Sequence, residues 1–101
     1  MKFYISGKRD EQERYSEAAE KLRQEGHEVI NYLDVTKQLP GMSRREHETM
    51  EHMLITMSDA IFVLNGWKES EAAKAEVFFA LENSVNIMFE QSEVVEELPF
   101  P

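Results

Sequence analysis

A carboxylate among small and apolar neighbours is the residue whose setting points most directly to chemistry. Glu76 lies within the stretch NGWKESEAAKAEVFFAL, residues 65–81. Ala73, Val77 and Ala80 share a helix side with it, because residues three or four apart lie on one face. The two alanines leave space around the carboxylate, and partial burial would raise its pKa. An aimed carboxylate can act as a nucleophile or a base, although most helical glutamates are simply solvated.

Two loops carry cations in an otherwise acidic chain. Residues 6–10, SGKRD, hold Lys8 and Arg9, and Gly7 before them allows a tight turn or close approach to a ligand. Residues 65–70, NGWKES, hold a third cation, Lys68, just before a predicted helix. Cations in both loops are compatible with a small anionic ligand.

Further groups in and near these loops fit a nucleotide. The free N–H groups of a helix N-terminus favour an anion, and Ser70 adds a hydroxyl there. Trp67 and Tyr4 offer rings on which a base can stack. The alternative is that Lys8 and Arg9 are solvated surface charges and Trp67 caps the core.

A second acid, Glu51, lies beside the apolar stripe of another predicted helix. His47 precedes it by four residues, which predicts a pairing between the two side chains. The three histidines have no metal-binding spacing, since His47 and His52 are five residues apart and HExxH does not occur. We therefore predict neither a metal site nor a cofactor.

The elements that must position these residues alternate along the chain. Strands are predicted at Lys2–Ser6, 28–32, 60–64 and 85–89, with a loop at 34–42. Capping-box patterns predict helix starts at Asp10 and Ser43, and a third helix is predicted at 70–83. The order βαβαβαβ predicts an α/β fold, a Rossmann-like or flavodoxin-like three-layer sandwich with a four-stranded parallel sheet. Ligands of such folds bind beyond the carboxyl ends of the strands, which selects the loops 6–10, 32–42 and 65–70.

Composition narrows the function classes. The chain has 101 residues, no Cys and a net charge of −9. The negative charge disfavours general binding to nucleic-acid phosphates. No apolar run is long enough to span a bilayer, and no signal-peptide core is present, so we expect a cytoplasmic protein without membrane contact. Residues 1–89 are predicted to form the domain and residues 90–101 an acidic tail with four Glu and no Lys or Arg.

Three motifs resemble the nucleoside 2-deoxyribosyltransferase-like superfamily, in particular its small phage and bacterial branch. They are FYISG at the first strand, SDAIFVLNGW at the third, and S-x-A-A-x-x-E from Ser70 to Glu76. The resemblance extends over about residues 1–89. It implies that Glu76 attacks the anomeric carbon of a deoxyribose and displaces the base, and that the sugar then passes to water or another base.

The resemblance also implies roles for other residues. Tyr4 would contact the nucleoside, Ser70 would help to hold a 5′-phosphate, and Glu51 would assist departure of the base. The two loops would form the rest of the substrate site, with Ser6, Gly7, Lys8, Arg9, Asn65, Gly66 and Trp67.

Three positions depart from the family pattern. Ala72 replaces a Gly, Glu51 replaces an Asp, and Lys8 replaces a Pro. A methyl group at position 72 would crowd a phosphate cradle or block a backbone angle that Gly adopts easily. Such changes favour loss of catalysis with retention of nucleotide binding.

Three hypotheses follow. The first is an N-glycosidase or deoxyribosyltransferase acting on a deoxynucleoside or its 5′-monophosphate, with the monophosphate favoured because cations and Ser70 crowd the rim. The second is a catalytically inactive nucleotide-binding module of the same fold, and the third is a protein-interaction module that acts through the acidic tail. We expect a homodimer, because the exposed sheet faces and the Met-rich second helix would gain from cover.

Overall fold

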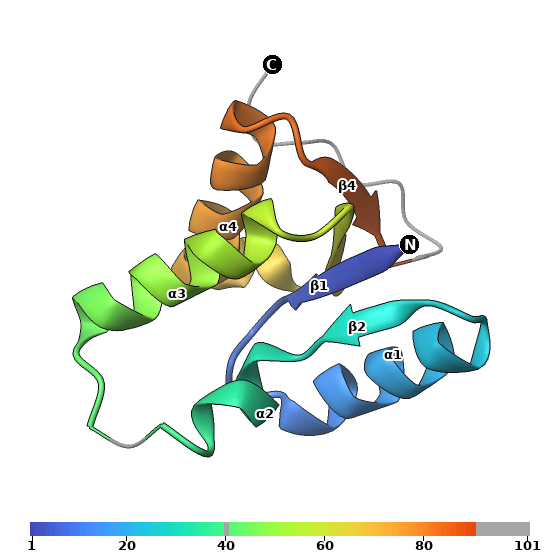
Figure 1. Cartoon of the computed structure of the whole chain (residues 1–101), viewed down its shortest axis with the longest axis horizontal. Helices are drawn as coiled ribbons and strands as arrows, with labels where there is room; N and C mark the ends of the chain where they lie inside the picture. Colours follow the sequence, from blue (N-terminus) through green and yellow to red (C-terminus); the bar gives the residue numbers. More distant parts are fainter. Residues whose placement is uncertain (40, 91–101) are drawn as a thin grey trace.

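The computed structural model describes residues 1–39 and 41–90, and its sheet is the predicted one. Four parallel strands, β1 (Lys2–Ser6), β2 (Glu28–Ile30), β3 (Ala60–Val63) and β4 (Asn86–Phe89), lie in the order β2-β1-β3-β4. The register pairs Tyr4 of β1 with Ile30 of β2 and Ile61 of β3. The fold is α/β with a three-layer, Rossmann-like arrangement, as the alternation of elements predicts (Figure 1).

Helices cover both faces of this sheet. Helix α1 (Gln12–Gln24) packs on one face, where Ile5 meets Tyr15 and Ala19. Helices α3 (Arg44–Thr56) and α4 (Glu71–Glu82) pack on the other, where Tyr4 meets Ile55 (Figure 1). The alternation of side chains along β1 therefore divides its residues between two cores.

The helix starts test the capping predictions. The box at Ser43 is confirmed, because Ser43 Oγ accepts from the Glu46 N–H while the Glu46 carboxylate accepts from the Ser43 N–H. The box at Asp10 is wrong, since α1 begins at Gln12 and its N-cap residue Glu11 makes no side-chain cap bond. The Glu11 N–H instead bonds the carbonyl of Lys8, so a turn precedes the helix.

The segment after β2 differs from its prediction. Tyr32 does not extend the strand but begins a short helix, α2 (Tyr32–Thr36), which runs into the region 34–42 predicted as loop. Asn31 is the N-cap, and its side chain accepts a hydrogen bond from the Leu33 N–H. The helix brings the Tyr32 ring into the core on the α3 side of the sheet.

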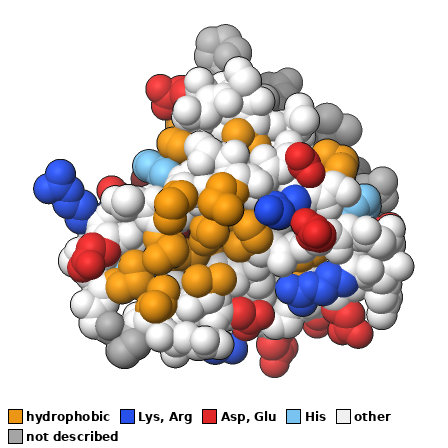
Figure 2. Space-filling view, viewed as in Figure 1, with side chains coloured by type: hydrophobic (Ala, Val, Ile, Leu, Met, Phe, Trp, Pro, Cys, Tyr) orange, Lys and Arg blue, Asp and Glu red, His pale blue; other side chains and the backbone are white. Residues whose placement is uncertain are grey.

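One face of the molecule carries exposed apolar side chains. Hydrophobic groups gather over and beside α3 in Figure 2, and Met53 of that helix and Met57 at its C-cap are 50% and 58% exposed. Phe78 and Leu81 of α4 are 44% and 42% exposed. Helix α4 thus has apolar residues on its outer side as well as on its buried side.

Candidate functional site

Glu76 reaches from α4 to the carboxyl end of β1 and is 1% exposed. Tyr4 and Ser6 point to the same face of β1, because side chains two residues apart share a face. The Tyr4 hydroxyl donates to Glu76 Oε2 at 2.5 Å, and Ser6 Oγ donates to Oε1 at 2.7 Å. Glu76 is thus buried rather than solvated, and two predicted substrate-binding residues prove to be its hydrogen-bond donors.

Arg9 joins the two candidate catalytic acids. Its Nη2 atom donates to Glu76 Oε2 at 2.7 Å and to Glu51 Oε2 at 3.0 Å. Glu51 comes from α3, so three separate segments meet at this nitrogen. The guanidinium carbon lies 5.2 Å from the centre of the Tyr32 ring, a cation–π arrangement.

Burial shapes the ionisation of the cluster. It raises the pKa of Glu76 from an ordinary 4.5 to about 7, against the opposing effects of Arg9, Tyr4 and Ser6. It also raises the pKa of Glu51, which Arg9 again opposes. The pKa of the Tyr4 hydroxyl lies well above its ordinary value because of burial and the nearby Glu76. Tyr4 therefore remains a hydrogen-bond donor to Glu76 at neutral pH.

The cluster forms part of the wall of a pocket of about 620 Å³ between α2, α3 and α4. Its charged lining holds two arginines and five glutamates, an acidic balance. Aromatic groups add flat surfaces, since the rings of His52 and Phe79 are stacked with centroids 4.0 Å apart. The pocket lining includes Arg9, Tyr32, His47, Glu51, Ala72 and Glu76.

His47 does not have the predicted partner. Its Nδ1 lies 2.6 Å from the Tyr32 hydroxyl, while the Glu51 carboxylate is held by Arg9. The pairing of His47 with Glu51 is wrong because Tyr32, brought near by the unpredicted helix α2, takes the imidazole. Tyr32 and Phe79 are pocket residues that sequence reasoning missed, and Asn31 was the available signal for the first of them.

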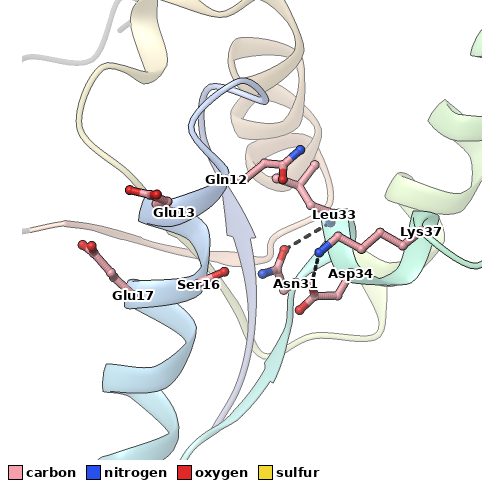
Figure 3. Close-up of a pocket in the computed structure, with 8 residues that line it drawn as sticks. All are labelled: Gln12, Glu13, Ser16, Glu17, Asn31, Leu33, Asp34 and Lys37. Carbon is pink, nitrogen blue, oxygen red and sulfur yellow. Dashed lines mark hydrogen bonds and ion pairs between the residues drawn. The ribbon is translucent and has the colours of Figure 1, made fainter.

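A second hollow, of about 320 Å³, lies between α1 and α2 (Figure 3). Its lining includes Glu13, Asn31 and Lys37, and none of the predicted site residues. Asn31 and Asp34 are bonded within α2 itself, to the Leu33 N–H and to Lys37 Nζ. This hollow does not show the convergent acids of the Glu76 pocket.

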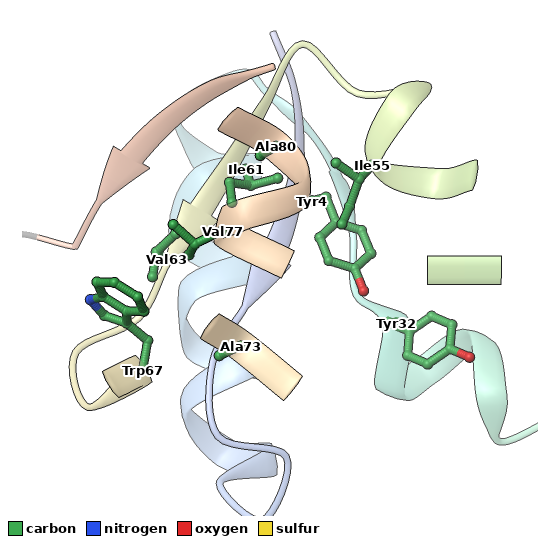
Figure 4. Packing of buried hydrophobic residues seen from close by; sticks show 9 residues of the cluster. All are labelled: Tyr4, Tyr32, Ile55, Ile61, Val63, Trp67, Ala73, Val77 and Ala80. Carbon is green, nitrogen blue, oxygen red and sulfur yellow. The ribbon is translucent and has the colours of Figure 1, made fainter. Parts of the chain in front are cut away.

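The loop after β3 lies apart from the pocket. Trp67 opens a 3₁₀ turn, η1 (Trp67–Glu69), and its side chain is 1% exposed in the core beside Phe89. Figure 4 shows it on the opposite side of α4 from Tyr4 and Tyr32. The reading that Trp67 caps the core is confirmed, and the structure does not support it as a stacking surface for substrate.

Other residues of this loop also make structural contacts. The backbone N–H of Asn65 donates to Glu90, and its carbonyl accepts from Arg14. Gly66 has φ of 88°, a left-handed conformation that side chains disfavour, and it leads into η1. Ser70 Oγ accepts from the Ala73 N–H as the N-cap of α4.

In the loop at residues 6–10, one residue lines the pocket and two make structural contacts. Arg9 enters the pocket wall, whereas Lys8 bonds Glu69 at 3.1 Å and lies 3.7 Å from Glu11. Gly7 packs closely against the chain, because a Cβ there would lie 3.0 Å from Leu64 Cβ and would press Leu64 aside. Gly7 therefore allows a close contact with Leu64 of the same chain and not with a ligand.

Within the described residues no cluster of three or more His, Asp or Glu side chains could hold a metal ion. None of the helices in that part of the chain is long and apolar enough to cross a membrane. The predicted tail, residues 90–101, lies outside the described residues except for Glu90, which bonds Arg14 at 2.5 Å.

The comparison with family models adds an assignment. A model of a domain of unknown function, DUF4406, matches residues 1–89. The chain belongs to the DUF4406 family. No curated protein and no solved structure matches it significantly. For this DUF4406 protein, the case for an activity therefore depends on the cluster of Glu76, Glu51 and Arg9 and on the resemblance of the motifs.

Proposed function

We propose that this DUF4406 protein is a nucleoside 2-deoxyribosyltransferase-like enzyme that cleaves or transfers the N-glycosidic bond of a deoxynucleoside. The observation that carries the proposal is the convergence of Glu76 and Glu51 on one nitrogen of Arg9 in the pocket wall. A buried nucleophile and a second acid are the two groups that such a reaction needs. The motifs that resemble the superfamily contribute Glu76, Glu51 and Tyr4 to the same place.

In the proposed reaction a carboxylate oxygen of Glu76 bonds to C1′ of the deoxyribose. The bond from C1′ to the base nitrogen breaks, its electron pair leaves with the base, and Glu51 supplies the proton. Water or a second base then attacks C1′ and gives up a proton to Glu51, while the bond from C1′ to the Glu76 oxygen breaks and releases Glu76 as a carboxylate. Both Glu Oε2 atoms lie within 3.0 Å of Arg9 Nη2, so they are at most about 6 Å apart, below the 6.5–9.5 Å typical of inverting glycosidases and compatible with a covalent intermediate.

The charge of the pocket favours a deoxynucleoside over its 5′-monophosphate. Five glutamates and two arginines line it, and they repel a phosphate. Lys8 is bonded to Glu69, Arg9 is bound to two acids, and Ser70 caps its own helix. Three of the side chains that favoured the monophosphate in the sequence therefore already have partners within the protein.

A catalytically inactive nucleoside-binding module is the second candidate. Both oxygens of Glu76 already accept hydrogen bonds, from Ser6 on one side and from Tyr4 and Arg9 on the other. Ala72, in the place of the family Gly, lies in the pocket wall. These two observations favour binding without cleavage.

One experiment separates the candidates. The protein and its Glu76→Ala variant are each incubated with the four deoxynucleosides and the four 5′-monophosphates, and released base is measured by chromatography. Base released from a deoxynucleoside by the unmodified protein alone supports the enzyme. A saturable thermal shift without released base supports the binding module, and equal release by the variant would exclude Glu76 as the nucleophile.

We further propose a cytoplasmic homodimer that covers the exposed side chains of α3 and α4, among them Met53, Phe78 and Leu81. Phe78 also lines the pocket, so a second copy on α4 would close its outer side. Sedimentation of the protein and of a Leu81→Glu variant tests this idea, with a dimer expected for the first and a monomer for the second. A monomer at high concentration for both would contradict it.

A further inference from the structure

Arg9 makes both of its ion pairs through a single nitrogen. Nη2 contacts Glu76 and Glu51, while Nη1 is buried and has no hydrogen-bond partner within residues 1–39 and 41–90. A two-nitrogen pairing with either acid alone would satisfy both nitrogens. The unsatisfied donor is explained if the arrangement serves to keep two carboxylates within reach of one cation.

The surroundings of Arg9 hold its guanidinium in that position. The ring of Tyr32 lies under it at 5.2 Å, and the Tyr32 hydroxyl is in turn held by His47 at 2.6 Å. Burial is the largest single effect on Arg9 and opposes its charge, but Glu76 together with the other acidic groups around it outweighs burial, so the pKa of Arg9 lies above its ordinary value. Arg9 is therefore a permanent cation beside a carboxylate that burial would otherwise keep protonated.

We propose that Arg9 is a positioning residue that holds Glu51 and Glu76 in one cluster and keeps Glu76 anionic, and that it is not a phosphate ligand. The inference rests on the proposed function for its catalytic meaning, since an anionic Glu76 is the form that attacks C1′. The effect of Arg9 on the ionisation of Glu76 does not depend on turnover, so it can be measured even if the protein cleaves no substrate.

Several other titratable groups act on Glu76 and must be held constant. The phenols and acids concerned come from β1, α1, α2 and α3, and all lie around the same guanidinium or carboxylate. They are Tyr4, Tyr15, Tyr32 and Glu51, with His47 beyond Tyr32. Variants restricted to position 9 leave this set unchanged.

The test is titration of the Glu76 carboxyl carbon by NMR in the unmodified protein, Arg9→Lys and Arg9→Met, with Glu76→Gln to assign the signal. In Arg9→Met we expect the midpoint of Glu76 to rise by about 1–3 pH units, because an opposite charge at this range contributes that much. Arg9→Lys keeps the cation and should restore most of the shift. If Arg9→Met does not fold, the comparison of Arg9→Lys with Arg9→Gln replaces it.

The kinetic readout follows the titration. The acid limb of kcat/KM should move upward with the Glu76 midpoint, so that kcat/KM at pH 6 falls about 10–1,000-fold in Arg9→Met and recovers at high pH. An unchanged Glu76 midpoint in folded Arg9→Met overturns the proposal, even if base release by the unmodified protein upholds the enzyme. A shifted midpoint with no base released by any form upholds the role of Arg9 and removes the proposed function. Weaker binding of a 5′-monophosphate alone, with an unmoved midpoint, returns Arg9 to phosphate binding.

Discussion

The cluster around Glu76 and the loop at residues 65–70 look equivalent in the sequence but differ in the structure. Arg9 of the cluster and the whole loop follow strands, and both regions combine polar groups with an aromatic side chain. Around Glu76 the polar groups converge on a pocket, whereas in the loop Trp67 is buried and Ser70 bonds its own helix. A position after a parallel strand therefore brings a residue to the correct rim, and local contacts decide whether it is available to a ligand.

The largest expected effect is on catalysis by the Glu76 cluster. Glu76→Gln keeps the shape of the side chain but removes its nucleophilic charge, so base release should fall by at least about 10³-fold. Glu82→Gln is the matched control, because Glu82 is on the same helix and lines the same pocket. Equal losses in the two variants would assign the effect to pocket charge rather than to attack by Glu76.

The loop should respond through stability. Trp67→Ala removes a fully buried ring, and we expect the free energy of unfolding to fall by about 3–5 kcal/mol. Chemical denaturation measures this change. Below the melting temperature the variant should still bind any nucleoside that the unmodified protein binds, and loss of that binding in folded Trp67→Ala would give Trp67 a direct role.

The pH dependence of stability should also distinguish the Glu76 cluster from the loop at residues 65–70. Folding raises the pKa of Glu76 from 4.5 to about 7, so the folded protein binds more protons than the unfolded chain between these values. The free energy of unfolding should therefore fall as pH rises from 4.5 to 7, by about 3 kcal/mol in total. Denaturation of Glu76→Gln at the same pH values should give a markedly flatter profile, and an identical profile would contradict the burial of an ionisable Glu76.

The smallest expected effects come from replacing one serine in each region, Ser70 in the loop and Ser6 in the Glu76 cluster. Ser70→Ala removes the N-cap of α4, and we expect a loss of about 1 kcal/mol in stability with base release retained in the folded protein. Ser6→Ala removes a donor to Glu76 and should change the pH profile of base release. A change in the pH profile of Ser70→Ala, and none in that of Ser6→Ala, would reverse the roles of the two regions.

Much of the fold could be predicted because its signals are local. The apolar run of β3 and the capping box at Ser43 are properties of short segments, and the structure reproduces them. The errors have local causes too: Asn31 begins a helix where an extended strand was expected, and Asp10 lies one residue too early to cap α1. Both concern ends of elements, where neighbouring residues compete for the same N–H groups.

The sequence could indicate the role of a site residue only where its type and its position together allow few roles. Small neighbours on the helix left room for Glu76 to be buried, and the structure buries it. The role of Arg9 was not accessible, because a basic residue after a strand fits a phosphate ligand as well as a clamp for two acids. Tyr32 was missed for a related reason, since its contact with His47 depends on the helix that turns it inward.

The sequence by itself determined the alternation of elements, the parallel sheet and the rim on which Glu76 and Arg9 lie, because hydrophobic period and turn residues act over a few positions. Only the tertiary structure decided which charges meet. Arg9, Glu51 and Glu76 are separated by up to 67 positions in the chain, yet two acids share one nitrogen. Such pairing depends on distances of a few ångströms between packed elements, because an ion pair forms only where the folded backbone brings the charges into contact.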